Sequence, residues 1–289
     1  MLVLFTDTDT DITPKMAEEF GYRLISMPYS IDGKSTSPYV DFEEFDAHAF
    51  YDKLRAGALP NTSAISEEAY RQYFEPHFEA GNDILYVHFS RAMTATFDAM
   101  DRAVAALLEK YPNVRFYEVD TKGITIGSLN IVLEIGRMYK DGKGAEEILE
   151  WAKEEVDRFA VYFFADDLRF FKHSGRVSGL AGTMGTLLGV RPIIYINDEG
   201  KMVSIGKERG REKAIERLVS YVEELGDDVK AHRVVIGHTD AGEVAAEVEK
   251  RLKERFGDDL NVVTVLVNPT AGAHCGPNGV GVSFHAIHR

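Results

Sequence analysis

The stretch LVLFTDTDTDITPKMAEEFG, residues 2–21, decides the fold. Its apolar start is typical of a buried strand, and its amphipathic second half is typical of a helix. Thr13 can cap that helix, Pro14 suits its first turn and Gly21 suits its exit. The stretch therefore predicts a strand followed directly by a helix, which is the repeating unit of α/β folds.

The same order of a short apolar run before a helical stretch returns along the chain. This alternation predicts a largely parallel sheet in each half of the protein. The pairs of segments are 84–89 before 97–108, 114–119 before 124–139, 161–164 before a glycine-rich loop, and 234–236 before 244–256.

Two places break the alternation, because Asp32-Gly33 and Glu199-Gly200 offer hairpin turns between β-prone residues. The sheets are therefore expected to be mixed. The helix predicted over 145–159 precedes a new strand, so we place a domain boundary there. The predicted organisation is an N-terminal α/β domain with a mostly parallel sheet, residues 1–159, and a C-terminal α/β domain with a mixed sheet, residues 160–289.

Composition narrows the class of protein. A chain of 289 residues exceeds the usual size of a single core, so two α/β domains with a ligand cleft between them are expected. The net charge of −14 disfavours nucleic acid as a partner. A single cysteine, no N-terminal signal pattern and no long apolar span give no support for export or membrane insertion, so we expect a cytoplasmic protein.

An acidic cluster follows the first strand, where Asp7, Asp9 and Asp11 alternate with threonines. With Ser90, Lys122 and the pair Asp166-Asp167 after later strands, the order resembles the haloacid dehalogenase phosphatases, with Asp7 as the nucleophile and magnesium as the metal. Turn and capping roles for these acids are the favoured alternative.

Two hydroxyl-rich loops precede helical stretches. Thr62 and Ser63 lie in one, with Ser66 as a helix cap, and Ser90 and Thr94 lie in the other. Such loops either cap their helices or supply hydroxyl and N–H donors to an anionic oxygen. Two helix N-termini of this kind can converge on a single carboxylate.

Two further loops carry basic side chains. Arg176 follows Lys172 and His173 in a loop of small residues, which is typical of an anion site, although a surface ion pair is the commoner role. His274 is expected in a turn after the apolar run 262–267, either as a structural histidine or as part of the same anion site. Its neighbour Cys275 is expected to pack as a small residue rather than to act as a nucleophile.

Glycines 179, 182 and 185 fit one helical face, and their spacing does not support nucleotide binding. The pair His285 and His288 lacks a third ligand, so no metal site is predicted.

Together these stretches resemble the DegV family of bacterial fatty-acid-binding proteins over nearly the whole chain. The matching blocks are Thr6 to Ile12, similar to Asp-Ser-Thr-x-Asp-Leu; Asn61 to Ser66, similar to Thr-Thr-Ser-Gln-Pro-Ser; and 119–127, 164–168, 174–178 and 272–277. The sequence departs from the family pattern at Met93-Thr94-Ala95-Thr96, where the family has Leu-Ser-Gly-Thr, and at Cys275 and Asn278.

The resemblance implies that a long-chain fatty acid binds in a buried tunnel between the domains. It implies that Thr62, Ser63, Thr94 and Ala95 hold the carboxylate, and that Arg176 and His274 support phosphoryl transfer. A separate fatty acid kinase subunit would bring ATP and magnesium and make the acyl phosphate, whereas this chain would bind lipid without a cofactor or catalysis of its own. A lipid sensor without a kinase partner and the Asp7 phosphatase remain the alternatives.

Overall fold

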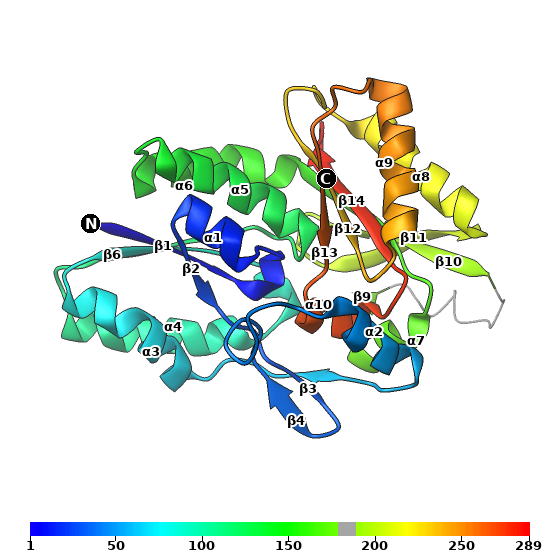
Figure 1. Cartoon of the computed structure of the whole chain (residues 1–289). Coiled ribbons are helices and arrows are strands. Elements are labelled where there is room, and N and C mark those ends of the chain that lie inside the picture. Colours follow the sequence, from blue (N-terminus) through cyan, green and yellow to red (C-terminus); the bar gives the residue numbers. More distant parts are fainter. Residues whose placement is uncertain (179–188) are drawn as a thin grey trace.

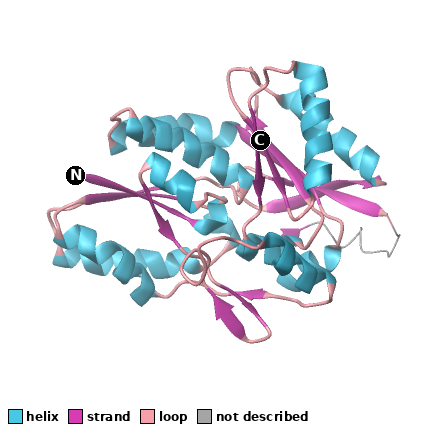
Figure 2. Ribbon diagram, in the orientation of Figure 1, coloured by secondary structure: helices cyan, strands magenta, loops and turns pink. Residues whose placement is uncertain are grey.

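The computed structural model describes residues 1–178 and 189–289, and within these ranges the strands form three sheets (Figures 1 and 2). The first sheet has the order β2-β1-β6-β7, and all its neighbouring strands are parallel. Its strands are β1 (Leu2–Asp7), β2 (Tyr22–Ile25), β6 (Asp83–His88) and β7 (Phe116–Asp120).

Helices cover both faces of this sheet (Figure 1). One face packs its buried side chains against α1 (Pro14–Phe20), α5 (Ile126–Lys140) and α6 (Ala145–Glu155). The other face packs against α3 (Glu67–Glu79) and α4 (Thr96–Lys110). The short 3₁₀ helices η1 (Thr8–Thr10), η2 (Arg91–Met93) and η3 (Val156–Arg158) follow β1, β6 and α6.

The chain between β1 and β2 folds as its residues predict. The Thr13 hydroxyl accepts a hydrogen bond from the Met16 N–H at 3.3 Å, and Pro14 is the first residue of α1. Gly21 ends the helix with φ of 78°, a left-handed conformation that glycine adopts without a Cβ clash. Thr13, Pro14 and Gly21 therefore define where α1 begins and ends between the parallel strands β1 and β2.

A small third sheet with the order β4-β3-β5 lies outside the first sheet, and its strands are antiparallel. Asp32 and Gly33 both have positive φ, 52° and 78°, as a two-residue hairpin turn requires, so the predicted hairpin is confirmed. The elements here are β3 (Tyr29–Ile31), β4 (Lys34–Thr36), α2 (Ala47–Arg55) and β5 (Asn61–Thr62).

The second large sheet is mixed and has the order β13-β12-β14-β8-β10-β11-β9. The hairpin predicted around Glu199-Gly200 joins β10 and β11 as an antiparallel pair. Helices α8 (Arg211–Leu225) and α9 (Gly242–Phe256) pack on one face of this sheet. Its strands are β8 (Phe159–Phe164), β9 (Val177–Ser178), β10 (Val190–Ile196), β11 (Met202–Arg209), β12 (Val234–His238), β13 (Val262–Leu266) and β14 (Val280–His285).

The first sheet is parallel and the second is mixed, as the sequence predicted for the two halves. In the second sheet, β14 runs antiparallel to both its neighbours, β8 and β12. The chain returns into β14 through a tight turn in which Gly276 and Asn278 have φ of 71° and 66°. Alternation of strands and helices cannot reveal such an inserted last strand, because the apolar pattern of a buried strand has no direction.

Two segments predicted as loops are helices. Helix α7 (Leu168–Ser174) includes Lys172 and His173, and helix α10 (Pro269–Cys275) includes His274. The Asn268 side chain caps α10 by accepting from the N–H groups of Thr270 and Ala271. Both helices have seven residues, which is less than two full turns of pattern, so periodicity did not predict them; α1 is equally short and was predicted with the help of its cap and exit residues, Thr13, Pro14 and Gly21. Glycines 179, 182 and 185 lie outside the described residues.

Helix α5 joins the two halves. Its buried side chains belong to one core with Leu4 of β1 and with Val161 of β8. The first sheet draws its strands from residues 2–120 and the second from residues 159–285, so the protein has two α/β halves that share a central helix layer. We retain the division after residue 159 as a proposal for the domain boundary. Within the described ranges, no helix combines the length and apolar character needed to cross a bilayer.

Candidate functional site

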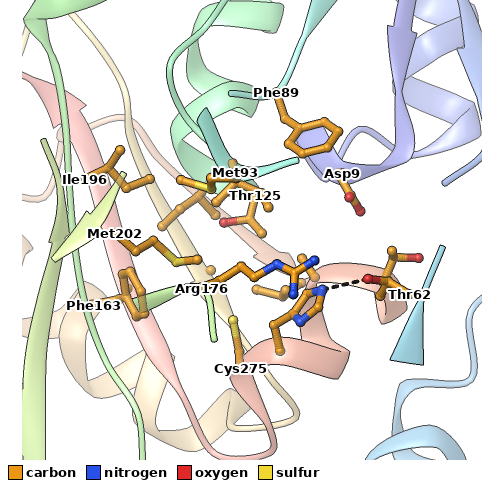
Figure 3. Close-up of a pocket in the computed structure, with 18 of the residues that line it drawn as sticks. Asp9, Thr62, Phe89, Met93, Thr125, Phe163, Arg176, Ile196, Met202 and Cys275 are labelled. Atoms are coloured by element: carbon orange, nitrogen blue, oxygen red, sulfur yellow. Dashed lines mark hydrogen bonds between the residues drawn. The ribbon is translucent and has the colours of Figure 1, made fainter. Parts of the chain in front are cut away.

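A cavity with a volume of about 220 Å³ lies between the two halves and takes lining residues from both (Figure 3). Its apolar wall comes from the second sheet through Phe163, Ile196 and Met202, and from the first half through Phe89 and Met93. An apolar wall of this kind gains free energy when it covers apolar ligand surface, in proportion to the area removed from water. The cavity is therefore suited to an apolar ligand.

Glycines let the layers behind this cavity approach closely. A Cβ on Gly281 of β14 would lie 2.7 Å from the Cβ of Phe163, and one on Gly237 of β12 would lie 2.4 Å from Cγ2 of Ile126. Both glycines also line the cavity. Larger residues there would push side chains of the wall inward.

The two hydroxyl-rich loops meet at the polar side of the cavity. Thr62, Ser63, Thr94 and Ala95 all line it, and they are half-buried or exposed. Thr96 holds the loops together, because its hydroxyl accepts from the Ile65 N–H at 2.9 Å. The sequence allowed this convergence of loops without establishing it, and the four residues that the family resemblance named as carboxylate ligands do line one cavity.

Other hydroxyls in these loops have structural roles. Ser66 caps α3 by accepting from the Ala69 N–H, which is the alternative considered for it. The Ser90 hydroxyl donates to the Gly200 carbonyl at 2.8 Å and so ties β6 to the hairpin of the second sheet. Ser66 therefore caps a helix, and Ser90 forms a hydrogen bond between the two halves.

His274 contacts the hydroxyl-rich loop directly. Its Nε2 lies 3.1 Å from the Thr62 hydroxyl, with either atom able to donate. Burial, and then the nearby Arg176 and His173, lower the pKa of His274 to about 4, so the imidazole is neutral at pH 7. Arg176 also lines the cavity but is exposed, and its guanidinium donates to the Ser174 carbonyl. Arg176, whose side chain is drawn in Figure 3, therefore supplies the positive charge on the polar side of the cavity.

Cys275 lines the cavity as a partly buried thiol. Burial, followed by the acidic residues Asp11 and Asp9, raises its pKa to about 12. A thiol that keeps its proton is a poor nucleophile, so the packing role predicted for Cys275 fits its surroundings.

Asp9 is the functional candidate that the sequence reasoning missed, since it considered this residue only as one of three loop acids. Its side chain lines the cavity, the residue is only 6% exposed, and its Oδ1 has no hydrogen-bond partner in the described part of the chain. Burial, with added repulsion from Asp7 and Asp11, raises its pKa well above the usual range. No local signal separates Asp9 from its neighbours; only the tertiary structure shows which of the three carboxyls turns toward the cavity.

Asp7 and Asp11 are instead held by hydrogen bonds. The Asp7 carboxyl accepts from the Tyr86 hydroxyl at 3.0 Å and from the N–H groups of Phe89 and Asp9. Asp11 accepts two hydrogen bonds of 2.8 Å from Asn268. Burial raises the pKa of both carboxyls to about 7 despite these hydrogen bonds.

The other residues of the phosphatase pattern are engaged elsewhere. Lys122 pairs with Asp157 at 2.8 Å on the surface, and Asp166 pairs with Arg191. Asp167 caps helix α7. A fully buried, hydrogen-bonded Asp7 is not placed to attack a phosphoryl group, so the capping and turn roles fit these acids better.

The fold and this cavity define a two-sheet α/β protein with a largely apolar pocket between its halves. A family model described as DegV, an uncharacterised protein family, matches residues 1–286. A DegV domain-containing protein of Clostridium perfringens is 30% identical over 282 residues, covering 98% of this chain and 96% of the relative. The chain belongs to the DegV family.

Solved structures show the same fold. A DegV family protein from Thermus thermophilus, described for its fatty acid binding, matches with a TM-score of 0.85 at 22% identity, covering 99% of each chain. A DegV family protein from Eubacterium eligens loaded with heptadecanoic acid matches with a TM-score of 0.83 at 20% identity, covering 99% of this chain and 100% of the other. These matches confirm the predicted fold class of two α/β domains.

Proposed function

We propose that this protein binds one long-chain fatty acid in the cavity between its halves. The observation that carries the proposal is the cavity itself, which joins an apolar wall to a mouth lined by two hydroxyl-rich loops. Relatives of the same fold are described as binding heptadecanoic acid and other fatty acids.

The acyl chain supplies most of the affinity in this proposal. Each buried methylene contributes about 0.8 kcal/mol, so a long chain contributes on the order of 10 kcal/mol before the cost of ordering it. A neutral hydrogen bond adds only about 1 kcal/mol. The hydroxyl loops therefore orient the carboxylate, while the apolar wall selects the chain.

The carboxylate faces Thr62, Ser63, Thr94 and Ala95 in this proposal. These residues are partly open to solvent at the mouth of the cavity. A carboxylate held there is within reach of a second protein, whereas the acyl chain stays covered.

We further propose that a separate fatty acid kinase subunit, carrying ATP and magnesium, phosphorylates the bound carboxylate in the cytoplasm. Arg176 and His274 would lie beside the transferred group, and the guanidinium would offset its negative charge. This chain would act as the lipid-presenting subunit. A lipid sensor without a kinase uses the same cavity, so only a kinase assay separates the two.

The first test is mass spectrometry of ligands extracted from natively purified protein, against a matched blank. We expect fatty acid at close to one per chain. If none is found, and none is taken up from a panel of fatty acids, the lipid-binding function is wrong and phosphatase assays with the Asp7→Asn variant come next.

The second test is the Arg176→Ala variant with the candidate ATP-binding kinase subunit of the same organism. We expect unchanged fatty acid binding and no acyl phosphate, because the guanidinium is needed only when the phosphoryl group arrives. Arg169→Ala is the matched control, since Arg169 is an exposed arginine of α7 that pairs with Asp167. Loss of lipid binding in Arg176→Ala would instead show a structural role.

A further inference from the structure

Asp9 is a buried carboxyl group that faces the cavity. Figure 3 places its carboxyl on the same side as Thr62, below Phe89. Only 6% of the residue is exposed, its side chain lines the cavity, and its Oδ1 has no hydrogen-bond partner among residues 1–178 and 189–289. A buried polar group left unpaired is costly, so a ligand that completes its hydrogen bonding is favoured.

The surroundings keep this carboxyl neutral. Burial is the main cause that disfavours ionisation of Asp9, and the buried acids Asp7 and Asp11 on the same loop add repulsion when they are ionised. The titratable groups across the cavity are Arg176, His274 and Cys275, of which only exposed Arg176 carries a charge at pH 7. Asp9 therefore presents an O–H donor.

Besides Asp9, the polar side of the cavity offers an anion the guanidinium of exposed Arg176, the hydroxyls of Thr62, Ser63 and Thr94, and the imidazole of His274. Hydrogen bonds from a hydroxyl donor to an ionised oxygen are short and about twice as strong as neutral ones. Two carboxyl groups that share one proton avoid the repulsion of two adjacent charges.

We propose that Asp9 is a head-group ligand of the bound fatty acid and donates its carboxyl proton in a hydrogen bond to the carboxylate. The inference rests on the proposed function. No bond other than the hydrogen bond forms: the proton stays between one oxygen of Asp9 and one of the fatty acid, and the pair carries a single negative charge.

The test measures dissociation constants at pH 6 for dodecanoic acid and its methyl ester with wild-type protein, Asp9→Asn and Asp9→Ala. The asparagine amide still donates a hydrogen bond, so we expect Asp9→Asn to bind the acid within about threefold of wild type. Asp9→Ala loses the donor to a charged group, and its affinity for the acid should fall roughly 10- to 100-fold.

The methyl ester is the control for folding of each variant. Its head group is uncharged and depends less on a donor, so all three proteins should bind it within about threefold of one another. A misfolded variant would lose both ligands, whereas loss of the Asp9 contact affects the acid selectively.

Two results overturn the assignment of Asp9 alone. The first is that wild-type protein and Asp9→Ala bind the acid equally well. The second is that both variants bind the acid more tightly than wild type, which would mean that Asp9 is ionised and repels it. Wild-type protein that binds neither ligand would overturn the proposed function, and the Asp9 assignment with it.

Discussion

At the scale of single residues, Thr62 links the hydroxyl-rich loop to His274 through a 3.1 Å contact. The Thr62→Ala variant removes one hydroxyl from the polar side of the cavity and leaves the apolar wall intact. Because a hydrogen bond contributes about 1 kcal/mol, or about 1.5–3 kcal/mol to a charged partner, we expect fatty acid affinity to fall by roughly 5- to 100-fold. Titration calorimetry with one fatty acid measures the change.

Ser66→Ala is the matched control for this experiment. Its hydroxyl caps α3, so its loss should lower the free energy of unfolding by about 1 kcal/mol and leave the affinity unchanged. Complete loss of binding in Thr62→Ala would contradict the division of labour between head group and acyl chain.

Individual residues differ in how far the sequence predicts their role. Thr13 and Ser66 act on N–H groups three residues away, so their caps follow from local pattern. The contact of Thr62 with His274 spans 212 positions and was not predicted; the resemblance to a family implied only that both side chains lie near the same carboxylate. The sequence did not single out Asp9, because the orientation of its side chain depends on how η1 packs in the folded protein. No short stretch of sequence encodes that packing.

At the scale of elements, helix α5 is the layer that both large sheets share, and Gly127 sets how closely it packs on β8. A Cβ at this position would lie 2.4 Å from Cγ2 of Val161. Val161 is buried and β-branched, so it has few alternative rotamers with which to give way. We expect Gly127→Ala to lower the free energy of unfolding by about 1–3 kcal/mol in urea, despite the higher helix propensity of alanine.

Gly242→Ala tests the propensity effect by itself. Gly242 begins α9 on the surface, and an added Cβ would have its nearest contact at 4.0 Å. This variant should be as stable as wild type or up to about 1 kcal/mol more stable. Equal stability of the Gly127→Ala and Gly242→Ala variants would mean that the α5–β8 contact relaxes without cost.

Elements also show where pattern reasoning fails. Helices α4, α5, α6 and α9 and both hairpins were predicted because their periodicity or turn chemistry is contained within a few residues, whereas α8 was not predicted. The seven-residue helices α7 and α10 and the direction of β14 were not, because tertiary packing determines them.

At the scale of the whole molecule, hydrogen bonds to Asp11 connect the two halves. This residue follows η1, and its carboxyl accepts two hydrogen bonds from Asn268, the residue that caps α10 and lies 257 positions away. A buried acid thus anchors the helix that carries His274 to the loop that carries Asp9.

This anchor makes stability depend on pH. The pKa of Asp11 is raised by burial from 3.8 to about 7, so the folded protein holds a proton that the unfolded chain releases above pH 4. Its contribution to stability is full below pH 4 and is lost as the pH rises to 7, at about 1.4 kcal/mol per pH unit. We therefore expect Asp11→Asn, whose amide oxygen can accept both hydrogen bonds, to match wild type near pH 4 and to exceed its free energy of unfolding by at least ~1 kcal/mol at pH 8. Urea denaturation across this pH range measures the difference in the free energy of unfolding. If that free energy changes with pH in the same way for both proteins, Asp11 is ionised in the folded protein, and its carboxylate connects the halves as an anion stabilised by its hydrogen bonds.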